Sequence, residues 1–284
     1  MILIFLQSDG RNLNISEGKA LKYKFSRKQL AIPYAIFLLL FVILPLLVVI
    51  FYAFTDAEGH VSFHNFLAFF GNFKTMGTLL YSVVIAVTTT LICLLIAYPT
   101  AYVLAKTNMK SGEALLLLFV LPMWINFTLR ITALKEILTL LEGNLALHPF
   151  LNTIVGMVYD FLPFMILPLY NALVKLDNSY MEAAQDLGAS KKNVFLKVIL
   201  PLSVPGIVSG VTMVLLPAMT NYVVLDMVYN STYIMGSLIG SYFSSYDWHN
   251  GSVISIILLV IIGISTLLSN RYTQGETDAK AGNF

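Results

Sequence analysis

Apolar and polar positions along this chain fall into long alternating blocks instead of following a single helical or strand period. A helix of about 20 apolar residues, rising 1.5 Å per residue, crosses the roughly 30 Å hydrocarbon layer of a bilayer. Six blocks are long enough, and the predicted spans are 31–55, part of 75–105, 114–134, 150–174, 202–225 and 251–270. The pattern therefore predicts an all-α polytopic membrane protein with six transmembrane helices.

Polar segments at the two ends of the chain set the predicted domain boundaries. Residues 31–271 form one transmembrane domain, which includes a charged internal loop at 174–201. Residues 1–30 form an N-terminal segment, and residues 272–284 form a polar tail. We place both terminal segments in the cytoplasm, for the reason given by the basic residues below.

The N-terminal segment carries five cations between residues 19 and 28, interleaved with Leu21, Phe25 and Leu30. This pattern is typical of an amphipathic helix that lies along anionic headgroups before a first span. The apolar stretch Met1–Leu6 is too short for a signal-peptide core, and we interpret it as a frayed terminus or one that lies on the membrane surface.

The distribution of basic residues gives the orientation. With the N-terminus in the cytoplasm, all but three of the 17 Lys and Arg residues fall on the inner side, the exceptions being Lys74, Arg130 and Lys135. Cytoplasmic loops of membrane proteins carry such an excess of cations. The loop 174–201 is therefore predicted to face the cytoplasm.

Composition agrees with a membrane protein, and the motifs that are missing exclude several kinds of catalytic and metal site. The chain is 58% hydrophobic and 11% charged, with a mean hydropathy of +0.80. Its one cysteine, Cys93, excludes an internal disulfide or a cysteine metal cluster. His60 and His64 have the spacing of a metal-binding pair but lack a third ligand, which favours a solvated loop. No P-loop, zinc-protease or serine-hydrolase motif occurs, so we predict no catalytic residue and no metal site.

The loop 174–201 reads as two short helices separated by a glycine. Ser179 followed by Glu182 has the spacing of a capping box, and Gly188 suits the left-handed end of a helix. The first helix places four residues on one face, namely Tyr180, Ala183, Ala184 and Leu187. The second helix is predicted over residues 191–200. This compact pair is well shaped for docking to another protein, and the alternative is an amphipathic loop lying on headgroups.

The residues of this loop carry a resemblance to a known family. Glu182-Ala183-Ala184, then Gly188, Val198 and Leu200-Pro201, resemble the EAA loop of the membrane subunits of binding-protein-dependent ABC importers. The resemblance implies a type I importer permease fold in a bacterial inner membrane. It also implies that a coupling helix with Glu182, Ala183, Ala184, Leu187 and Gly188 docks on a separate ATPase, which binds the ATP and Mg²⁺. This chain is then expected to bind no cofactor.

A second resemblance concerns the solute. The segment 162–170 and the following loop, together with 129–131 and 215–219, are similar to the PotB-type permeases of spermidine/putrescine importers. This likeness implies transport of polyamines. It further implies three kinds of partner: a second permease of PotC type, a dimer of an ATPase of PotA type, and an extracytoplasmic binding protein of PotD type.

Polar and aromatic groups within the spans are candidates for the substrate pathway. Asp160 lies near the centre of the fourth span, where a carboxylate is costly unless it meets a cavity or a partner. A basic or hydroxyl group on a neighbouring helix is the structural alternative, and Arg130 has either Asp160 or Glu136 as a possible partner. The other pathway candidates are Trp124, Tyr159, Tyr222 and Asp226, because aromatic faces and carboxylates attract cations.

Two other classes of function remain open at this point. A sister importer for ferric ion, phosphate or sulfate shares the same docking loop. A gradient-driven carrier or an intramembrane enzyme explains the membrane spans but leaves the Glu-Ala-Ala loop without a role.

Overall fold

The computed structural model describes residues 31–56, 58–106, 112–228 and 230–281, and these are helical except for connecting loops and one isolated bridge between Thr55 and Val61. The chain divides into two compact units, Met1–Leu46 and Leu47–Phe284. The predicted amphipathic segment before residue 31 and the stretch Met1–Leu6 lie outside the described residues.

The first unit is the start of the first predicted span. It contains α1 (Ala31–Leu38), a π-helical turn (Leu39–Ile43) and the beginning of α2 (Leu44–Ala53). The 22 residues Ile32–Ala53 have a mean hydropathy of 3.1, which is enough for one membrane span.

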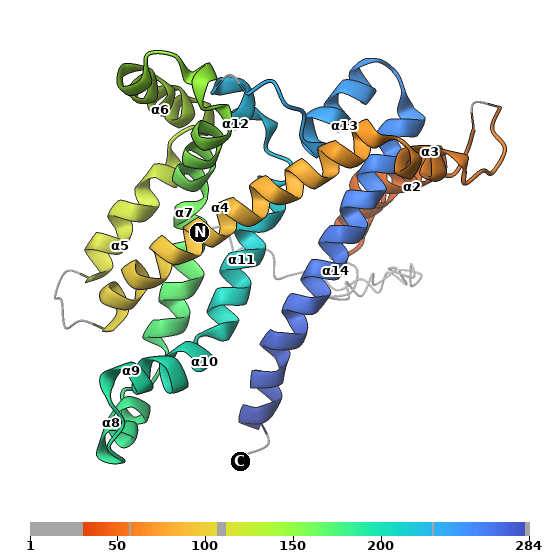
Figure 1. Cartoon of the computed structure of the whole chain (residues 1–284). Helices are drawn as coiled ribbons and strands as arrows, with labels where there is room; N and C mark the ends of the chain where they lie inside the picture. The colour runs from red at the N-terminus through yellow and green to blue at the C-terminus, as the bar shows by residue number, and fades with distance from the viewer. Residues whose placement is uncertain (1–30, 57, 107–111, 229, 282–284) are drawn as a thin grey trace, which may run out of the picture. The chain divides into compact units, whose positions relative to one another are not determined.

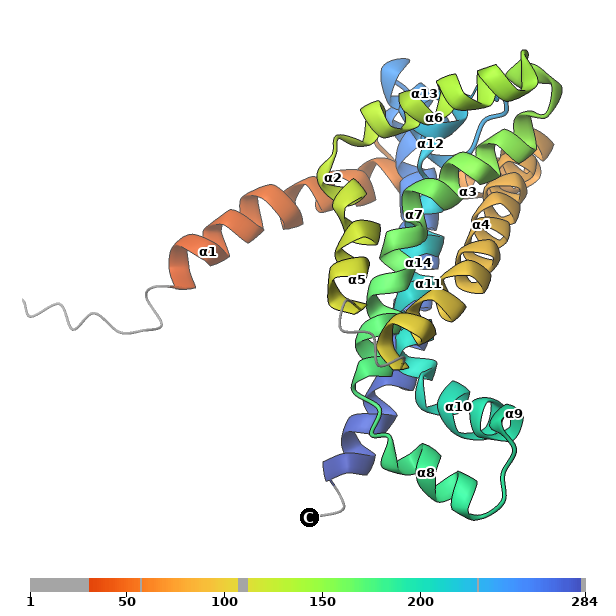
Figure 2. The same cartoon turned by 90° about the vertical axis from the view of Figure 1, so that its left-hand side faces the viewer.

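Three long helices form the centre of the second unit (Figures 1 and 2). They are α4 (Phe73–Lys106), α7 (Pro149–Val174) and α11 (Val204–Ala218), and each packs on the other two. Close packing in their centre is favoured by Gly206, whose Cβ substituent would lie 3.0 Å from the Pro168 carbonyl oxygen. Small residues at such contacts let membrane helices approach closely.

The remaining helices surround this centre. Their bounds are α3 (His64–Gly71), α5 (Gly112–Val120), α6 (Phe127–Glu142), α8 (Ser179–Asp186), α9 (Lys191–Val194), α10 (Leu200–Leu202), α12 (Tyr222–Met227), α13 (Met235–Ser244) and α14 (Trp248–Ala281). Short 3₁₀ turns occupy Leu121–Trp124 and Leu145–Leu147, and a π-helical turn occupies Phe195–Ile199.

The all-α prediction is confirmed, and the described residues contain between four and six candidate membrane spans. Within the described residues, four helices are long and apolar enough to cross a membrane, or six if each of two bent pairs counts as one span. The bent pairs are Ala114–Trp124 with Phe127–Glu142, at 100°, and Lys191–Leu202 with Val204–Ala218, at 61°.

The third predicted span is two helices, which together are long and apolar enough for one bent span. The chain bends after Trp124 because Pro122 opens a 3₁₀ turn and Ile125 is extended, with ψ of 142°. Asn126 then begins a new helix, α6, by accepting a hydrogen bond from the Thr128 backbone N–H at 2.9 Å. The predicted loop 135–149 is wrong over its first half, since α6 continues to Glu142.

The last two spans differ from the prediction at their outer or C-terminal ends. Helix α11 ends at Ala218, beside Pro217, and α12 begins separately at Tyr222. The predicted connection 226–250 contains α13, and α14 continues past residue 270 to Ala281. Asn221 separates α11 from α12, because its backbone is not helical, with φ of −77° and ψ of 79°.

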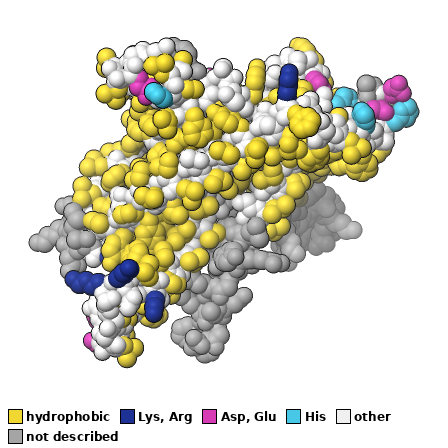
Figure 3. Space-filling view, in the orientation of Figure 1, with side chains coloured by type: hydrophobic (Ala, Val, Ile, Leu, Met, Phe, Trp, Pro, Cys, Tyr) yellow, Lys and Arg dark blue, Asp and Glu magenta, His cyan; other side chains and the backbone are white. Residues whose placement is uncertain are grey.

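Charged side chains gather at two opposite ends of the second unit, with a mainly hydrophobic surface between them (Figure 3). Lys and Arg side chains gather near α8 and α9, whereas acidic and His side chains gather near α6 and near the loop before α3. This separation is the one expected for a protein whose middle faces lipid.

Candidate functional site

The loop between α7 and α11 begins with a short polar turn that fixes α8. The Asp177 carboxylate accepts a hydrogen bond from the Ser179 backbone N–H at 2.9 Å. Hydrogen bonds from the Ser179 backbone and hydroxyl, with the nearby Lys106 ammonium, hold the pKa of Asp177 below its usual value. Asn178 is the N-cap residue, so the predicted capping box of Ser179 and Glu182 does not form. At the start of α8, the side-chain oxygen that accepts a backbone N–H therefore belongs to Asp177, whereas the sequence predicted Ser179 in this role.

Gly188 ends α8 as the sequence predicts. It adopts φ of +80°, and its N–H donates to the Gln185 carbonyl at 2.8 Å. The next N–H, of Ala189, donates to the Ala184 carbonyl at 3.0 Å. A glycine at this place satisfies the last helical carbonyls without the cost of a Cβ atom. Ser190 then caps α9 by accepting from the Asn193 N–H.

The outward face of α8 exposes apolar side chains. Leu187 is 90% exposed and Tyr180 is 57% exposed, and Ala183 beside them is also exposed. Ala184 is half-buried and packs toward the core of the second unit, so the four predicted residues do not share one free face. Glu182 is exposed on the same helix. An exposed apolar surface on a polar segment favours contact with another protein.

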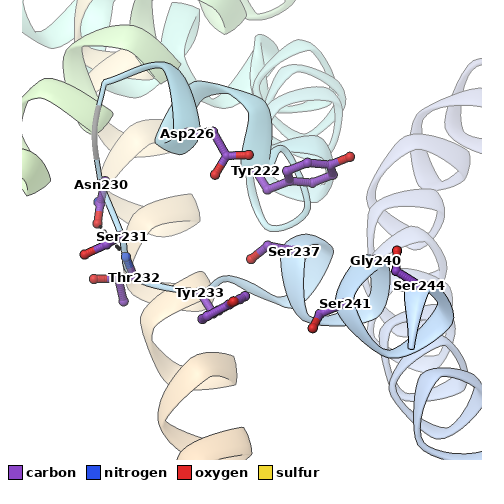
Figure 4. A pocket seen from close by; sticks show the side chains of 10 residues that line it. All are labelled: Tyr222, Asp226, Asn230, Ser231, Thr232, Tyr233, Ser237, Gly240, Ser241 and Ser244. Atoms are coloured by element: carbon purple, nitrogen blue, oxygen red, sulfur yellow. Dashed lines mark hydrogen bonds between the residues drawn. The ribbon is translucent and has the colours of Figure 1, made fainter. Parts of the chain in front are cut away.

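A cavity of about 540 Å³ lies at the other end of the second unit, between α12 and α13 (Figure 4). Two predicted pathway residues, Tyr222 and Asp226, line it from α12. The other lining residues come from the following loop and α13, and they are Asn230, Ser231, Thr232, Tyr233, Ser237, Gly240, Ser241 and Ser244. Figure 4 shows Asp226 and Tyr222 on one side of this outer cavity, with Ser237 and Ser241 opposite.

Buried hydrogen bonds fix the loop that forms the outer cavity. The Asn230 side-chain amide donates to the Tyr81 hydroxyl at 3.0 Å and to the Thr153 hydroxyl at 2.9 Å. The Met235 backbone N–H donates to the Ser82 hydroxyl at 2.8 Å. Tyr81 and Ser82 belong to α4, and Thr153 belongs to α7. The loop therefore takes its position from the two central helices.

The chemistry of the outer cavity suits a cation with several N–H donors. Asp226 is the one carboxylate among its lining residues, and the Tyr222 and Tyr233 rings add aromatic faces. The serine and threonine hydroxyls and the Asn230 amide supply neutral acceptors. Sequence reasoning did not single out Tyr233 or the α13 serines, although the Tyr- and Ser-rich character of residues 226–250 was the available signal.

Asp160 has a different environment from the one expected on a solute pathway. The structure pairs it with Arg130, whose Nη2 lies 2.5 Å from the Asp160 Oδ1, and both side chains are more than nine-tenths buried. The sequence left Asp160 and Glu136 as possible partners of Arg130, and in the structure the partner is Asp160. Trp124 and Tyr159 are exposed and lie outside the outer cavity.

Comparisons with known proteins identify the family of the chain. The family model described as "Binding-protein-dependent transport system inner membrane component" matches residues 20–274. The spermidine/putrescine transport system permease protein PotB of Haemophilus influenzae is 38% identical over 268 residues, covering 87% of this chain and 93% of the relative. The protein of the same name in Escherichia coli is 35% identical over 259 residues, covering 84% and 94%.

Solved structures support the same fold. A chain from the crystal structure of a bacterial alginate ABC transporter, in complex with a periplasmic protein bound to alginate pentasaccharide, aligns with a TM-score of 0.68 at 14% identity and covers 88% of this chain and 94% of its own. A chain of the MetNI methionine ABC transporter aligns with a TM-score of 0.52 at 17% identity, covering 72% and 98%. The chain therefore belongs to the family of binding-protein-dependent transport system inner membrane components, and it is a multi-pass, non-catalytic permease subunit of a bacterial ABC importer.

Proposed function

We propose that this permease conducts polyamines, with spermidine and putrescine as substrates, and that Tyr222 and Asp226 meet the cation at the outer end of its route. The observation that carries this proposal is the outer cavity, in which a single carboxylate is surrounded by aromatic rings and hydroxyls. Relatives named as spermidine/putrescine permeases at 35–38% identity support the same substrate class. An ammonium group gains both from the carboxylate charge and from an aromatic face.

The partners follow from the same family. We propose that the chain pairs with a second permease of PotC type, receives solute from a binding protein of PotD type, and is driven by two ATPase subunits of PotA type. The N-terminus lies in the cytoplasm, so the loop between α7 and α11 faces the ATPase and the outer cavity faces the binding protein. The exposed Leu187 and Tyr180 support docking of α8, which acts as the coupling helix.

The other three pathway candidates have different support. Trp124 and Tyr159 are exposed aromatic residues outside the outer cavity, and we propose that they line a later part of the route. Asp160 is held by Arg130, so its contribution to the pathway is to keep α6 in place on α7. Its carboxylate meets the cation only if this ion pair opens during transport.

Asp226→Asn tests the substrate contact. Removing the charge is expected to raise the spermidine concentration for half-maximal uptake by about ten-fold or more, since a hydrogen bond to a charged group contributes about 1.5–3 kcal/mol. Uptake of labelled spermidine by cells that express the complete transporter measures this. Glu58→Gln is the matched control, because Glu58 is an acid on an outer loop, 82% exposed and outside the cavity.

The same assay separates the proposed substrate from its rivals. Labelled uptake that excess putrescine suppresses, and that ferric ion, phosphate and sulfate leave unchanged, supports polyamine transport. Equal spermidine kinetics for Asp226→Asn and the parent protein would show that the Asp226 carboxylate does not bind the substrate on its route. Failure of the parent protein to take up spermidine would reject the polyamine proposal altogether.

Gly188→Val tests the coupling loop. A Cβ atom at Gly188 would meet no atom within 4 Å, so the cost arises only from the positive φ of +80°. A β-branched residue in that conformation is disfavoured by roughly 1–2 kcal/mol or more. We expect Gly188→Val to reduce uptake several-fold while the permease remains in the membrane, as measured by transport and by immunoblot.

Gly188→Asn is the control, because asparagine tolerates a left-handed conformation, and it should retain most of the uptake. Equal losses in both variants would argue against the role of this backbone conformation.

A further inference from the structure

One face of α4 contacts both ends of the loop that we propose to couple transport to the ATPase. Tyr98, Tyr102 and Lys106 are spaced four residues apart near the C-terminal end of this helix, so their side chains lie along one face. We refer to these three residues as the α4 stripe. Its contacts join segments that are about 70 to 105 residues away in the sequence.

Lys106 holds the start of the loop. Its ammonium donates to the Leu176 carbonyl oxygen at 2.6 Å and to the Asn178 side-chain oxygen at 3.0 Å. Leu176 lies two residues after the end of α7 at Val174, and Asn178 is the N-cap of α8. A cation at the C-terminal end of a helix is favourable because the carbonyl oxygens there lack helical partners. Lys106 therefore fixes the junction through which α7 leads into α8.

Tyr98 and Tyr102 hold the end of the loop. The Phe195 ring, which follows α9, makes edge-on contacts with both tyrosine rings, at centroid distances of 5.7 Å each. The Tyr98 hydroxyl also lies 2.8 Å from the Ser203 hydroxyl, a buried hydrogen bond at the start of α11. Edge-to-face aromatic pairs and buried hydrogen bonds each add to the stability of such a contact.

The same helix reaches the outer cavity at its other end. Tyr81 and Ser82 of α4 accept the hydrogen bonds from Asn230 and from the Met235 backbone that position the cavity loop. Helix α4 continues without a break for 34 residues, which at 1.5 Å per residue is about 50 Å. Pro99 lies within it, but the helix continues on both sides of this residue. One continuous helix thus contacts the coupling loop and the cavity loop.

We propose that α4 transmits movement from the ATPase-facing loop to the outer cavity, with Lys106 and Tyr98 as the positioning residues that join it to the loop. Because both ends of the loop are fixed to one face of α4, displacement of the loop moves α4 with it. The hydrogen bonds that Tyr81 and Ser82 accept from Asn230 and from the Met235 backbone carry that displacement to the residues that line the outer cavity. This inference rests on the proposed coupling function but not on the identity of the solute.

A reporter cysteine in the outer cavity measures transmission without any solute. Ser241 lines the cavity, so Ser241→Cys in a Cys93→Ser background is labelled by a membrane-impermeant maleimide. The complete transporter is compared without nucleotide and with ATP plus vanadate. In the otherwise unsubstituted protein, the labelling rate is expected to differ between the two states. Lys106→Met and Tyr98→Phe should reduce this difference by about five-fold or more, the usual lower size of coupling between distant sites.

Matched variants separate transmission from general damage. Lys74→Met removes a lysine from the opposite end of α4, and Tyr170→Phe removes a hydroxyl on α7, outside the α4 stripe and the outer cavity. Both should retain the full nucleotide response. Lys106→Arg keeps the positive charge and its N–H donors, with a different donor geometry, and should retain more of the response than Lys106→Met. Co-purification of the ATPase shows that each complex is assembled.

The outcomes also distinguish the inference from the proposed substrate. A full nucleotide response in assembled Lys106→Met and Tyr98→Phe complexes would overturn transmission through the α4 stripe. A response that these variants lose and the controls keep supports it, even if the transporter does not take up spermidine. If the unsubstituted protein shows no nucleotide response, the coupling proposal fails and this inference fails with it.

Discussion

Asp160→Leu is expected to destabilise the permease by about 3–5 kcal/mol, because it removes one partner of a buried ion pair and leaves the other without compensation. The Arg130 and Asp160 side chains are 6% and 4% exposed, and their charged atoms lie 2.5 Å apart. The Nε and Nη1 of Arg130 have no other hydrogen-bond partner in the described part of the chain. A lower thermal unfolding midpoint of the purified protein, and less protein in the membrane, would show this loss.

The double variant Arg130→Met with Asp160→Leu is the control for this prediction. A buried ion pair replaced by apolar groups of similar size is often neutral, so the double variant should recover most of the lost stability. Equal instability in the single and double variants would mean that side-chain shape, and not charge, is responsible. Both variants are made in the full-length protein and compared by the same unfolding assay.

Asp160→Asn separates stability from passage of the solute. Asparagine retains an oxygen acceptor for Arg130 but lacks the charge, so a moderate loss of stability is expected. If uptake per folded molecule is unchanged, Asp160 acts by holding α6 against α7. A rise in the spermidine concentration for half-maximal uptake, at normal stability, would instead place its carboxylate on the route.

The features that the sequence predicted well depend on local patterns. Apolar runs of bilayer length gave α4 and α7 nearly to their ends, because burial of such runs in lipid needs no knowledge of their neighbours. Gly188 identified the end of α8, because a left-handed position strongly favours glycine. Family resemblance added the importer type and the proposed polyamine substrate, which local patterns in the sequence do not identify by themselves.

The features that the sequence did not determine depend on residues far apart in the chain or on competing local signals. The sequence offered two possible acidic partners for Arg130, namely Asp160 and Glu136. Only the packing of α6 on α7 shows that the partner is Asp160. The bend near Trp124 was signalled by Pro122 and Asn126, but the apolar run around them favoured one continuous span. At α8, Asp177 competed with Ser179 as the capping side chain.

The outer cavity shows both kinds of feature. Asp226 and Tyr222 were candidates in the sequence because a carboxylate and an aromatic face both attract cations. Their neighbours, Tyr233 in the loop and the serines on α13, become part of the site only because Asn230 and Met235 attach the loop to α4. Composition alone does not distinguish such a loop from an ordinary solvated connection.

The same attachment makes Gly236→Ala the other substitution with a large expected effect. A Cβ atom at Gly236, in the first turn of α13, would overlap the Thr220 carbonyl oxygen and lie 2.7 Å from its carbonyl carbon. These contacts are backbone atoms, so relief requires α13 to move away from the segment between α11 and α12. We expect a loss of about 3 kcal/mol, at the upper end of the usual cost of overpacking.

Movement of α13 would also weaken the hydrogen bond from the Met235 N–H to Ser82 and would change the outer cavity, so uptake should fall together with stability. Thermal unfolding and spermidine uptake of the complete transporter measure the two effects. Gly263→Ala is the matched control, because a Cβ atom there meets nothing within 4 Å and the residue lies in α14, outside the cavity. It should remain as stable as the parent protein, since alanine is the better helix former. Near-parental stability and uptake for Gly236→Ala would show that α13 tolerates displacement from Thr220 and that the cavity does not depend on this close contact.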